Sequence, residues 1–341
     1  MLTDTFNRGT IDRRCVSDRQ YASDRRCVSD YRRGSAAGKS SNCRALVISN
    51  GGNLYLKRLC AFLLALLCMS TGFGHGALAQ ELAICTNPQR PACPSALRGL
   101  PDAEFTFSRL IFADNPIAIN DLGDRIGYPH WQADCSESEP HFIAAMKRLT
   151  RVDTNQESQS ISLLDERLYD FPMLYVVEAG FAAFSRAETD NLREYLLRGG
   201  FLLVDDFHGS YQWEQFEDWI SQAFPDRDIV DIPQNHDIFN VHFPIDDFIQ
   251  IPGLRALCLN PGQTWELPIS KSMAVVESNS SRQQPRWRGI LDDDGRVMVV
   301  VNWNMDLGDA WEHADMEEYS ALYTATAYRL GVNYVIYGMT H

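Results

Sequence analysis

The sequence predicts an α/β protein in three layers, with helices on both faces of a mainly parallel sheet. Three observations lead to this fold class. Apolar strand-like runs alternate with amphipathic helical segments along residues 102–341, and one strand, helix and strand follow each other over short connections. The 341 residues are 45% hydrophobic and 22% charged, a composition that can bury a sizeable core. We expect residues 102–341 to form a single domain.

The first strand and the first helix are expected near the start of this domain. EFTFSRLIF at 104–112 predicts a strand because it is rich in phenylalanine and alternates for part of its length. The polar segment 113–137 follows, and its length is typical of a functional or irregular loop. Ser138 then opens a helix that reaches Leu149, because its apolar residues recur at helical spacing.

The clearest unit is a strand, a helix and a strand in succession. PMLYVVEAG at 172–180 predicts a buried strand, and FLLV at 201–204 predicts the next one. Between them, Ser185 and Glu188 have the spacing of a capping box and Gly199 ends the helix. A helix joining two strands in this way predicts a right-handed crossover between parallel strands.

The last elements follow the same logic. YQWEQFEDWISQAF at 211–224 predicts an amphipathic helix, and apolar runs at 272–278 and 296–303 predict two more strands. Asp315 and Glu318 have the spacing of a capping box, so they predict the start of a long C-terminal helix.

Charge divides the chain into two unlike parts. Residues 1–79 carry 12 Lys and Arg against 5 Asp and Glu, a net charge of +7. Residues 80–341 carry 19 against 40, a net charge of −21. A domain with this negative charge repels nucleic acid phosphates and anionic membrane surfaces. Its sequence contains no stripe of basic residues that would offset the repulsion. We therefore expect no nucleic-acid partner.

The basic part predicts a leader and an export signal. Residues 1–53 contain RRCVSD twice and predict a disordered or wrongly included segment. Residues 54–79 predict a signal peptide, because Lys57 and Arg58 precede an apolar stretch and ALA precedes Gln80. That stretch is shorter than the ~20 residues that span a bilayer. We expect a periplasmic or secreted protein; the alternative is an uncleaved signal segment, the only membrane contact expected.

Residues 80–101 predict a linker rich in cysteine and proline. Cys85 and Cys93 enclose the loop CTNPQRPAC, and we expect them to form a disulfide. Cys135 and Cys258 bring the cysteines beyond the leader to an even number, which suits an oxidising compartment. The spacing in this loop does not match a zinc site.

Three apolar runs end in polar residues that parallel strands would bring to one edge of the sheet. YVV ends at Glu178, FLLV ends at Asp205 and Asp206, and VMVVV runs into the polar segment 302–309. Ligands bind beyond the carboxyl ends of strands in such sheets. The expected ligand-binding residues are Arg109, Glu178, Asp205, Asp206, His208, Asn302, Asn304, Asp306, Asp309 and Trp311.

Structural interpretations of these residues remain open. Asp206 and Asp309 also suit the capping of the turns that follow them. His208 has the chemistry of a metal ligand, but no recognised ligand spacing supports a metal. Arg109 is the one basic residue within the first strand, so it clamps an anion or serves as the partner of a buried carboxylate. We expect no metal and no cofactor.

Several blocks of the domain resemble one bacterial family. They include NLREYLLRGGFLLVDDFHG, FPDRDIVDIPQNHDIFN, RGILDDDGRVMVVVNWNMDLGDAWE and YRLGVNYVIYGMTH, and they are similar to the domain-of-unknown-function 4159 family over roughly residues 102–341. The resemblance implies a fold like that of class I glutamine amidotransferases, flavodoxin-like in its layering, and no known reaction. Such amidotransferases carry a nucleophilic cysteine at a tight strand-to-helix turn. Here that turn begins at Glu178 and contains no cysteine.

Two function classes follow. The missing thiol nucleophile favours a non-catalytic domain that binds a small molecule or an envelope protein. The alternative is a hydrolase in which Asp205 or Asp206 activates water, His208 shuttles a proton or binds a metal, and Asp306 or Asp309 completes the site. Nucleotide binding is disfavoured because neither GxGxxG nor GxxxxGK[ST] occurs.

Overall fold

The computed structural model describes residues 93, 103–122, 127–135, 137–259 and 286–341. The predicted leader and signal peptide lie outside these residues, as does the predicted strand at 272–278. No helix in the described ranges is both long enough and apolar enough to cross a bilayer.

A seven-stranded mixed sheet forms the centre of the domain. Five neighbouring strands run parallel, the sixth pairs antiparallel with the fifth, and the seventh pairs antiparallel with the sixth. In spatial order the strands are β3 (Gln159–Ser162), β1 (Ser108–Ile111), β4 (Met173–Val176), β6 (Phe201–Val204), β9 (Val297–Trp303), β8 (Arg286–Leu291) and β7 (Val230–Asp231).

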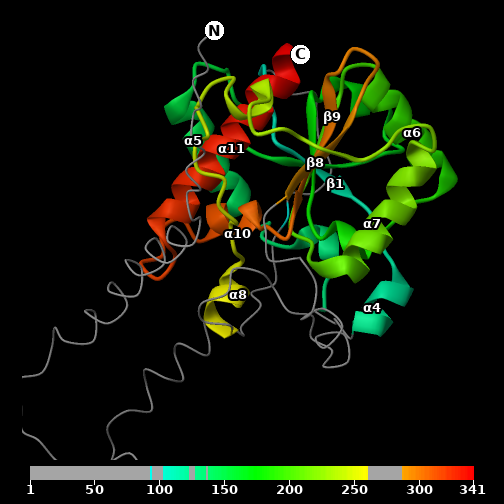
Figure 1. Ribbon diagram of the computed structural model, residues 1–341, viewed down its shortest axis with the longest axis horizontal. Helices are drawn as coiled ribbons and strands as arrows, with labels where there is room; N and C mark the ends of the chain where they lie inside the picture. Colours follow the sequence, from blue (N-terminus) through cyan, green and yellow to red (C-terminus); the bar gives the residue numbers. More distant parts are fainter. Residues whose placement is uncertain (1–92, 94–102, 123–126, 136, 260–285) are drawn as a thin grey trace, which may run out of the picture. The chain divides into compact units, whose positions relative to one another are not determined.

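Helices cover both faces of this sheet, so the α/β class is confirmed (Figure 1). Helices α5 (Ser138–Leu149) and α11 (Ala321–Thr340) share a core with one face. Helices α6 (Arg186–Leu197) and α7 (Gly209–Ala223) share a core with the other. Both sides of β4 are therefore buried, which explains its continuous apolar run.

Short elements lie at the carboxyl end of the parallel strands. Figure 1 shows α4 (Pro116–Leu122), α8 (Leu254–Leu259) and α10 (Leu307–Glu312) at one end of the sheet. Helix α10 directly follows β9, so this is the carboxyl end. The remaining elements are β2 (Ala113–Asp114), β5 (Ala182–Ala183), η2 (His130–Gln132), η3 (Glu166–Asp170), η4 (Ala179–Phe181) and η5 (Asp237–Phe239).

The capping box of α6 is confirmed, whereas that of α11 is wrong. Ser185 Oγ accepts a hydrogen bond from Glu188 N–H at 3.4 Å, and Glu188 Oε2 accepts one from Ser185 N–H at 2.7 Å. Helix α11 instead begins after Ser320, whose hydroxyl accepts from Leu322 N–H. Tyr319 just before it is buried and donates to the Pro252 carbonyl oxygen, and this tertiary anchor sets where the helix begins.

Two other local expectations need correction. The first strand spans Ser108–Ile111 rather than all of 104–112, and the expected loop contains β2, α4 and η2. The strand β8 was missed, because its sequence RWRGIL is interrupted by Gly289 and lacks a sustained apolar or alternating pattern, and its pairing with β9 in a hairpin sets it.

The predicted disulfide is also wrong. Cys93 pairs with Cys135, with Cα atoms 5.1 Å apart, so it does not pair with Cys85. Cys258 is disulfide-bonded as well. The short loop between Cys85 and Cys93 favoured pairing of these two residues. The fold instead brings the buried Cys135 to Cys93 across 42 residues.

Candidate functional site

Three tight turns leave the carboxyl ends of neighbouring strands. Glu178, Asp206 and Asn304 follow β4, β6 and β9, and each has a left-handed backbone with φ between 50° and 59°. Non-glycine residues rarely adopt this conformation, although Asn and Asp tolerate it best. The only other described non-glycine residue with positive φ is Asp134, at 58°. Backbone strain is thus concentrated at this edge.

The β6 and β9 turns are tied together by hydrogen bonds. The backbone N–H of Asp206 donates to the Met305 carbonyl oxygen at 3.1 Å, and Asn304 N–H donates to the Phe207 carbonyl oxygen at 3.1 Å. The Asn304 side-chain oxygen accepts from Gly209 N–H at the start of α7. The structure therefore places Asp206 and Asn304 side by side, and Asn304 shapes the turn.

Asp205 is a sealed carboxylate beneath these turns. It is 0% exposed and accepts from Tyr175 Oη–H at 3.1 Å, from the Asn302 amide at 3.4 Å, and from the N–H groups of Leu307 and Gly308. Burial raises its pKa to about 7, against the opposing effect of these donors. Asp205 thus joins β4, β6, β9 and α10 and has no face open to a ligand.

Asp306 and Asp309 lie at the start of α10. Asp306 caps the helix by accepting from Asp309 N–H at 2.7 Å, while Asp309 accepts from Leu254 N–H at 2.6 Å. Asp309, expected to cap the following turn, therefore accepts from the first residue of α8 instead. Burial, followed by the charges of Asp206 and Asp309, raises the pKa of Asp306 well above its usual value. Burial also favours a higher pKa for Asp309, but bonding to His313 lowers it.

Asp134 brings a third carboxylate to this pair from the expected loop. Oxygens of Asp134, Asp306 and Asp309 all lie within 4.8 Å of one another. The Oδ2 atom of Asp134 is enclosed and has no hydrogen-bond partner. It rests above Gly308, where a Cβ would come within 2.3 Å of it. Burial, then the charges of Asp309 and Glu312, raise the pKa of Asp134 well above its usual value.

Glu312 and His313 extend the cluster along α10. His313 Nε2 lies 3.4 Å from Asp309 Oδ1 and 3.8 Å from Glu312 Oε2. Burial, followed by the charge of Asp309, raises the pKa of Glu312 to about 7. Burial opposes protonation of His313, yet its bond to Asp309 raises its pKa. These three residues form a second group with metal-ligand spacing that shares Asp309.

Asp206 and His208 form a separate pair. His208 Nε2 lies 3.1 Å from Asp206 Oδ1, and the His208 side chain is only 7% exposed. Burial lowers the pKa of His208 to about 3, so the ring is neutral at physiological pH. Its Nδ1 atom is buried without a hydrogen-bond partner. The pair therefore places a neutral imidazole ring near the carboxylates of Asp134, Asp306 and Asp309.

Arg109 does not contact the carboxylates at the strand ends. Its Nε donates to Glu139 Oε1 at 2.5 Å, and its Nη1 donates to the carbonyl oxygens of Trp131 and Ala133. Arg109 is 1% exposed, so its position corresponds to the partner of a buried carboxylate. It holds the turn before Asp134 against α5.

Two further predicted residues lie in the core of the domain. Trp311 is 0% exposed and packs against Phe107, Phe142 and Tyr175. Asn302 is also 0% exposed, and it accepts from the Tyr334 hydroxyl while donating to Asp205. Neither side chain has a surface open to a ligand.

Sequence reasoning missed Asp134, Glu139 and Glu312. Asp134 lies in the segment expected to be a long polar loop, Glu139 lies at the start of the helix predicted after it, and Glu312 lies beyond the polar segment at 302–309. The unusual length of the loop was the one available signal. Nothing local to Asp134 indicates that its carboxylate meets Asp306, which lies far along the chain.

This arrangement has the chemistry of a hard-cation site. Asp134, Asp306 and Asp309 supply three carboxylates, the ligands that Ca²⁺ and Mg²⁺ prefer. Two oxygens bound to one Ca²⁺ lie within about 5 Å of each other, because each bond is about 2.5 Å long. The separations between these three residues meet that limit.

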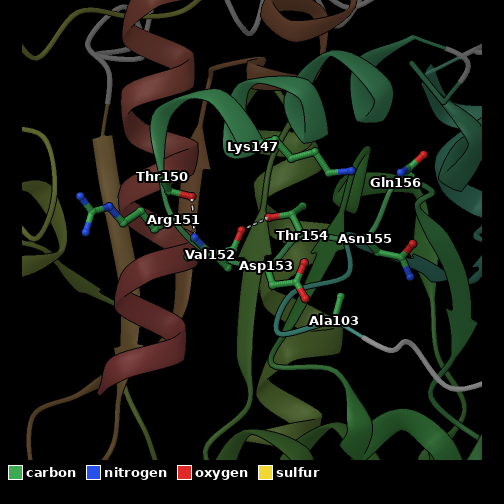
Figure 2. A pocket seen from close by; sticks show the side chains of 9 residues that line it. All are labelled: Ala103, Lys147, Thr150, Arg151, Val152, Asp153, Thr154, Asn155 and Gln156. Atoms are coloured by element: carbon green, nitrogen blue, oxygen red, sulfur yellow. Dashed lines mark hydrogen bonds between the residues drawn. The ribbon is translucent and has the colours of Figure 1, made fainter.

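A polar pocket lies at the opposite, amino edge of the sheet. It is lined by Ala103 before β1, by Lys147 on α5, and by residues 150–156 before β3 (Figure 2). Thr150 and Thr154 form hydrogen bonds with the backbone of Val152. Figure 2 also shows Arg151 pointing away from the other lining side chains.

Comparison with known proteins gives a family but no activity. No curated protein matches this sequence. One family model, described as a domain of unknown function, matches residues 123–339, a span that includes the carboxyl-edge turns and α10. Because this match covers well over half of the chain, the protein belongs to the DUF4159 family.

Proposed function

We propose that this protein is an exported, non-catalytic binding domain that holds a divalent cation between Asp134, Asp306 and Asp309. One observation carries the proposal: Asp134 Oδ2 is enclosed beside two other carboxylates and has no hydrogen-bond partner. A buried polar atom without a partner is rare and needs a physical explanation. The proposal departs from our sequence-based expectation of no metal, because that expectation did not include Asp134.

Electrostatics supports a cationic ligand. The raised pKa values of Asp134 and Asp306 show that burial and mutual repulsion disfavour their charged forms. A divalent cation would offset both effects, since it replaces lost hydration and neutralises the like charges. Arg109, the nearest buried cation, is already engaged by Glu139 and two carbonyl oxygens.

The turn after β4 supports binding rather than thiol chemistry. We infer an amidotransferase-like arrangement in which Glu178, with φ of 53°, stands where such enzymes carry their nucleophile. Cysteine is absent from this turn, so a thioester route has no thiolate. The disulfide between Cys93 and Cys135 supports the export inferred from the signal sequence, because disulfides persist in oxidising compartments.

Isothermal titration of the full-length protein with Mn²⁺, Ca²⁺ and Mg²⁺ tests the proposal. We expect saturable binding of at least one ion, and at least tenfold weaker binding by Asp134→Asn. Asp153→Asn at the amino edge is the matched control, and its affinity should equal that of the wild type. Equal affinities for all three proteins, or no binding by the wild type, would contradict the proposal.

A hydrolase is the second candidate, favoured by the Asp206–His208 pair. The contact of His208 Nε2 with the Asp206 carboxylate is the geometry of a histidine oriented for proton transfer. Turnover of ester and phosphodiester model substrates, with and without Mn²⁺, distinguishes this candidate from a binding domain. Activity that is lost in His208→Ala, while Mn²⁺ affinity is kept, would favour the hydrolase.

A further inference from the structure

The turn that carries Asp134 is held on its N-terminal side by a buried arginine. Arg109 Nη1 donates to the carbonyl oxygens of Trp131 at 3.1 Å and Ala133 at 2.6 Å. The same guanidinium binds Glu139 through Nε, so it links the turn to α5. The backbone leading into Asp134 is therefore fixed by tertiary contacts.

The other side of the turn depends on the disulfide. Cys135 follows Asp134 directly and is 2% exposed, and it is bonded to the partly exposed Cys93. The Cys135 N–H donates to the Gln132 carbonyl oxygen only at a long 3.4 Å, while Ser138 N–H donates to the Asp134 carbonyl oxygen at 3.1 Å. The disulfide is thus the only covalent tie between this turn and a distant segment of the described chain.

Asp134 needs such restraint. Its left-handed backbone is unfavourable for a residue with a Cβ, and its enclosed Oδ2 lacks a hydrogen-bond partner. A freed turn would relieve both penalties by turning the carboxylate toward water. Gly308 has no Cβ, so the Asp134 carboxylate can lie close to the backbone of α10 when the turn is held in place.

We propose that the Cys93–Cys135 disulfide positions Asp134 for cation binding and makes that binding depend on the thiol–disulfide state. This inference rests on the proposed function. The co-reactant is a dithiol: its thiolate attacks the more exposed Cys93 sulfur, the S–S bond breaks, and Cys135 leaves as a thiolate that takes up a proton. The second thiol then displaces Cys93, so the pair gains two electrons and two protons and the dithiol becomes a disulfide.

Mn²⁺ binding, followed by electron paramagnetic resonance, tests the inference with the full-length protein. We expect the double variant Cys93→Ala/Cys135→Ala to bind Mn²⁺ at least tenfold more weakly than the oxidised wild type. Dithiothreitol should weaken binding by the wild type and leave the double variant unchanged. That second comparison separates this disulfide from the one at Cys258.

Two further outcomes are decisive. A lower unfolding midpoint with an unchanged Kd would show that the disulfide serves stability alone, which overturns the inference. If the oxidised wild type binds none of Mn²⁺, Ca²⁺ and Mg²⁺, the proposed function fails, and hydrogen exchange at the Asp134 and Cys135 amides decides the inference instead. Faster exchange in the double variant supports the restraint, and equal exchange overturns it.

Discussion

The two edges of the sheet differ in what they bury. The amino-edge pocket is lined by exposed or partly exposed side chains, apart from the buried Thr154, and Thr150 and Thr154 both hydrogen-bond with the backbone of Val152 (Figure 2). The carboxyl edge buries Asp205 and Asp306 and encloses the Oδ2 atom of Asp134, and it contains every positive-φ non-glycine residue of the described chain. The presence of a surface pocket alone is therefore a poor guide to function. Backbone strain and desolvated charge, which cluster at functional sites in proteins, are concentrated at the carboxyl edge.

The largest expected effect at the carboxyl edge is on stability. Asp205→Ala removes the acceptor for four buried donors, and unsatisfied buried donors cost about 1–3 kcal/mol each. We expect the free energy of unfolding to fall by about 3–5 kcal/mol, as when a buried charged partner is removed. Urea denaturation measures this. Asp153→Ala at the amino edge should change stability by no more than about 0.5 kcal/mol.

Gly308→Ala tests how closely α10 approaches Asp134. The new Cβ would lie 2.3 Å from Asp134 Oδ2 and 2.8 Å from Tyr175 Oη, so both groups must move. We expect a loss of about 1–3 kcal/mol, typical of overpacking. Mn²⁺ binding should also weaken at least tenfold. Unchanged binding and stability would show that the two edges are equally tolerant.

The buried Asp205 should make the stability of the protein depend on pH, whereas Asp153 at the amino edge serves as the control. Its pKa is raised to about 7 in the folded protein, so the folded state binds the proton more tightly than the unfolded state does. The stability linked to this proton is complete below pH 4 and is lost as pH rises to about 7, with a slope of at most about 1.4 kcal/mol per pH unit.

Urea denaturation between pH 4 and pH 8 in the presence of a chelator checks this prediction. The free energy of unfolding of the wild type, minus that of Asp205→Asn, should decrease as pH rises. Asp153→Asn is the matched control for the substitution itself. A difference that stays constant or increases with pH would contradict the assigned direction.

The smallest effects are expected at the amino-edge pocket. Lys147→Ala and Arg151→Ala remove exposed side chains, and such substitutions usually change stability by no more than about 0.5 kcal/mol. Mn²⁺ affinity should equal that of the wild type in both variants, as measured by titration. A tenfold loss in either variant would remove the distinction between the two edges.

Local patterns predicted most of the parallel core. The run of β4, the capping box of α6 and the helical spacing in α5 and α7 lie where the sequence indicated. These features depend on residues within one turn or one strand. The start of α11 and the hairpin strand β8 were not predicted, because Tyr319 and the pairing with β9 decide them through distant contacts.

Local periodicity in the sequence predicts apolar strands that run into polar residues, and a crossover helix between two of them. Tertiary packing decides that Asp205 is sealed and that Asp134 meets Asp306 and Asp309. Asp205 accepts from Leu307 N–H across 102 residues, and Asp134 reaches α10 from a loop with no helical or strand pattern. Such partners depend on how whole layers pack, and no local spacing encodes that distance.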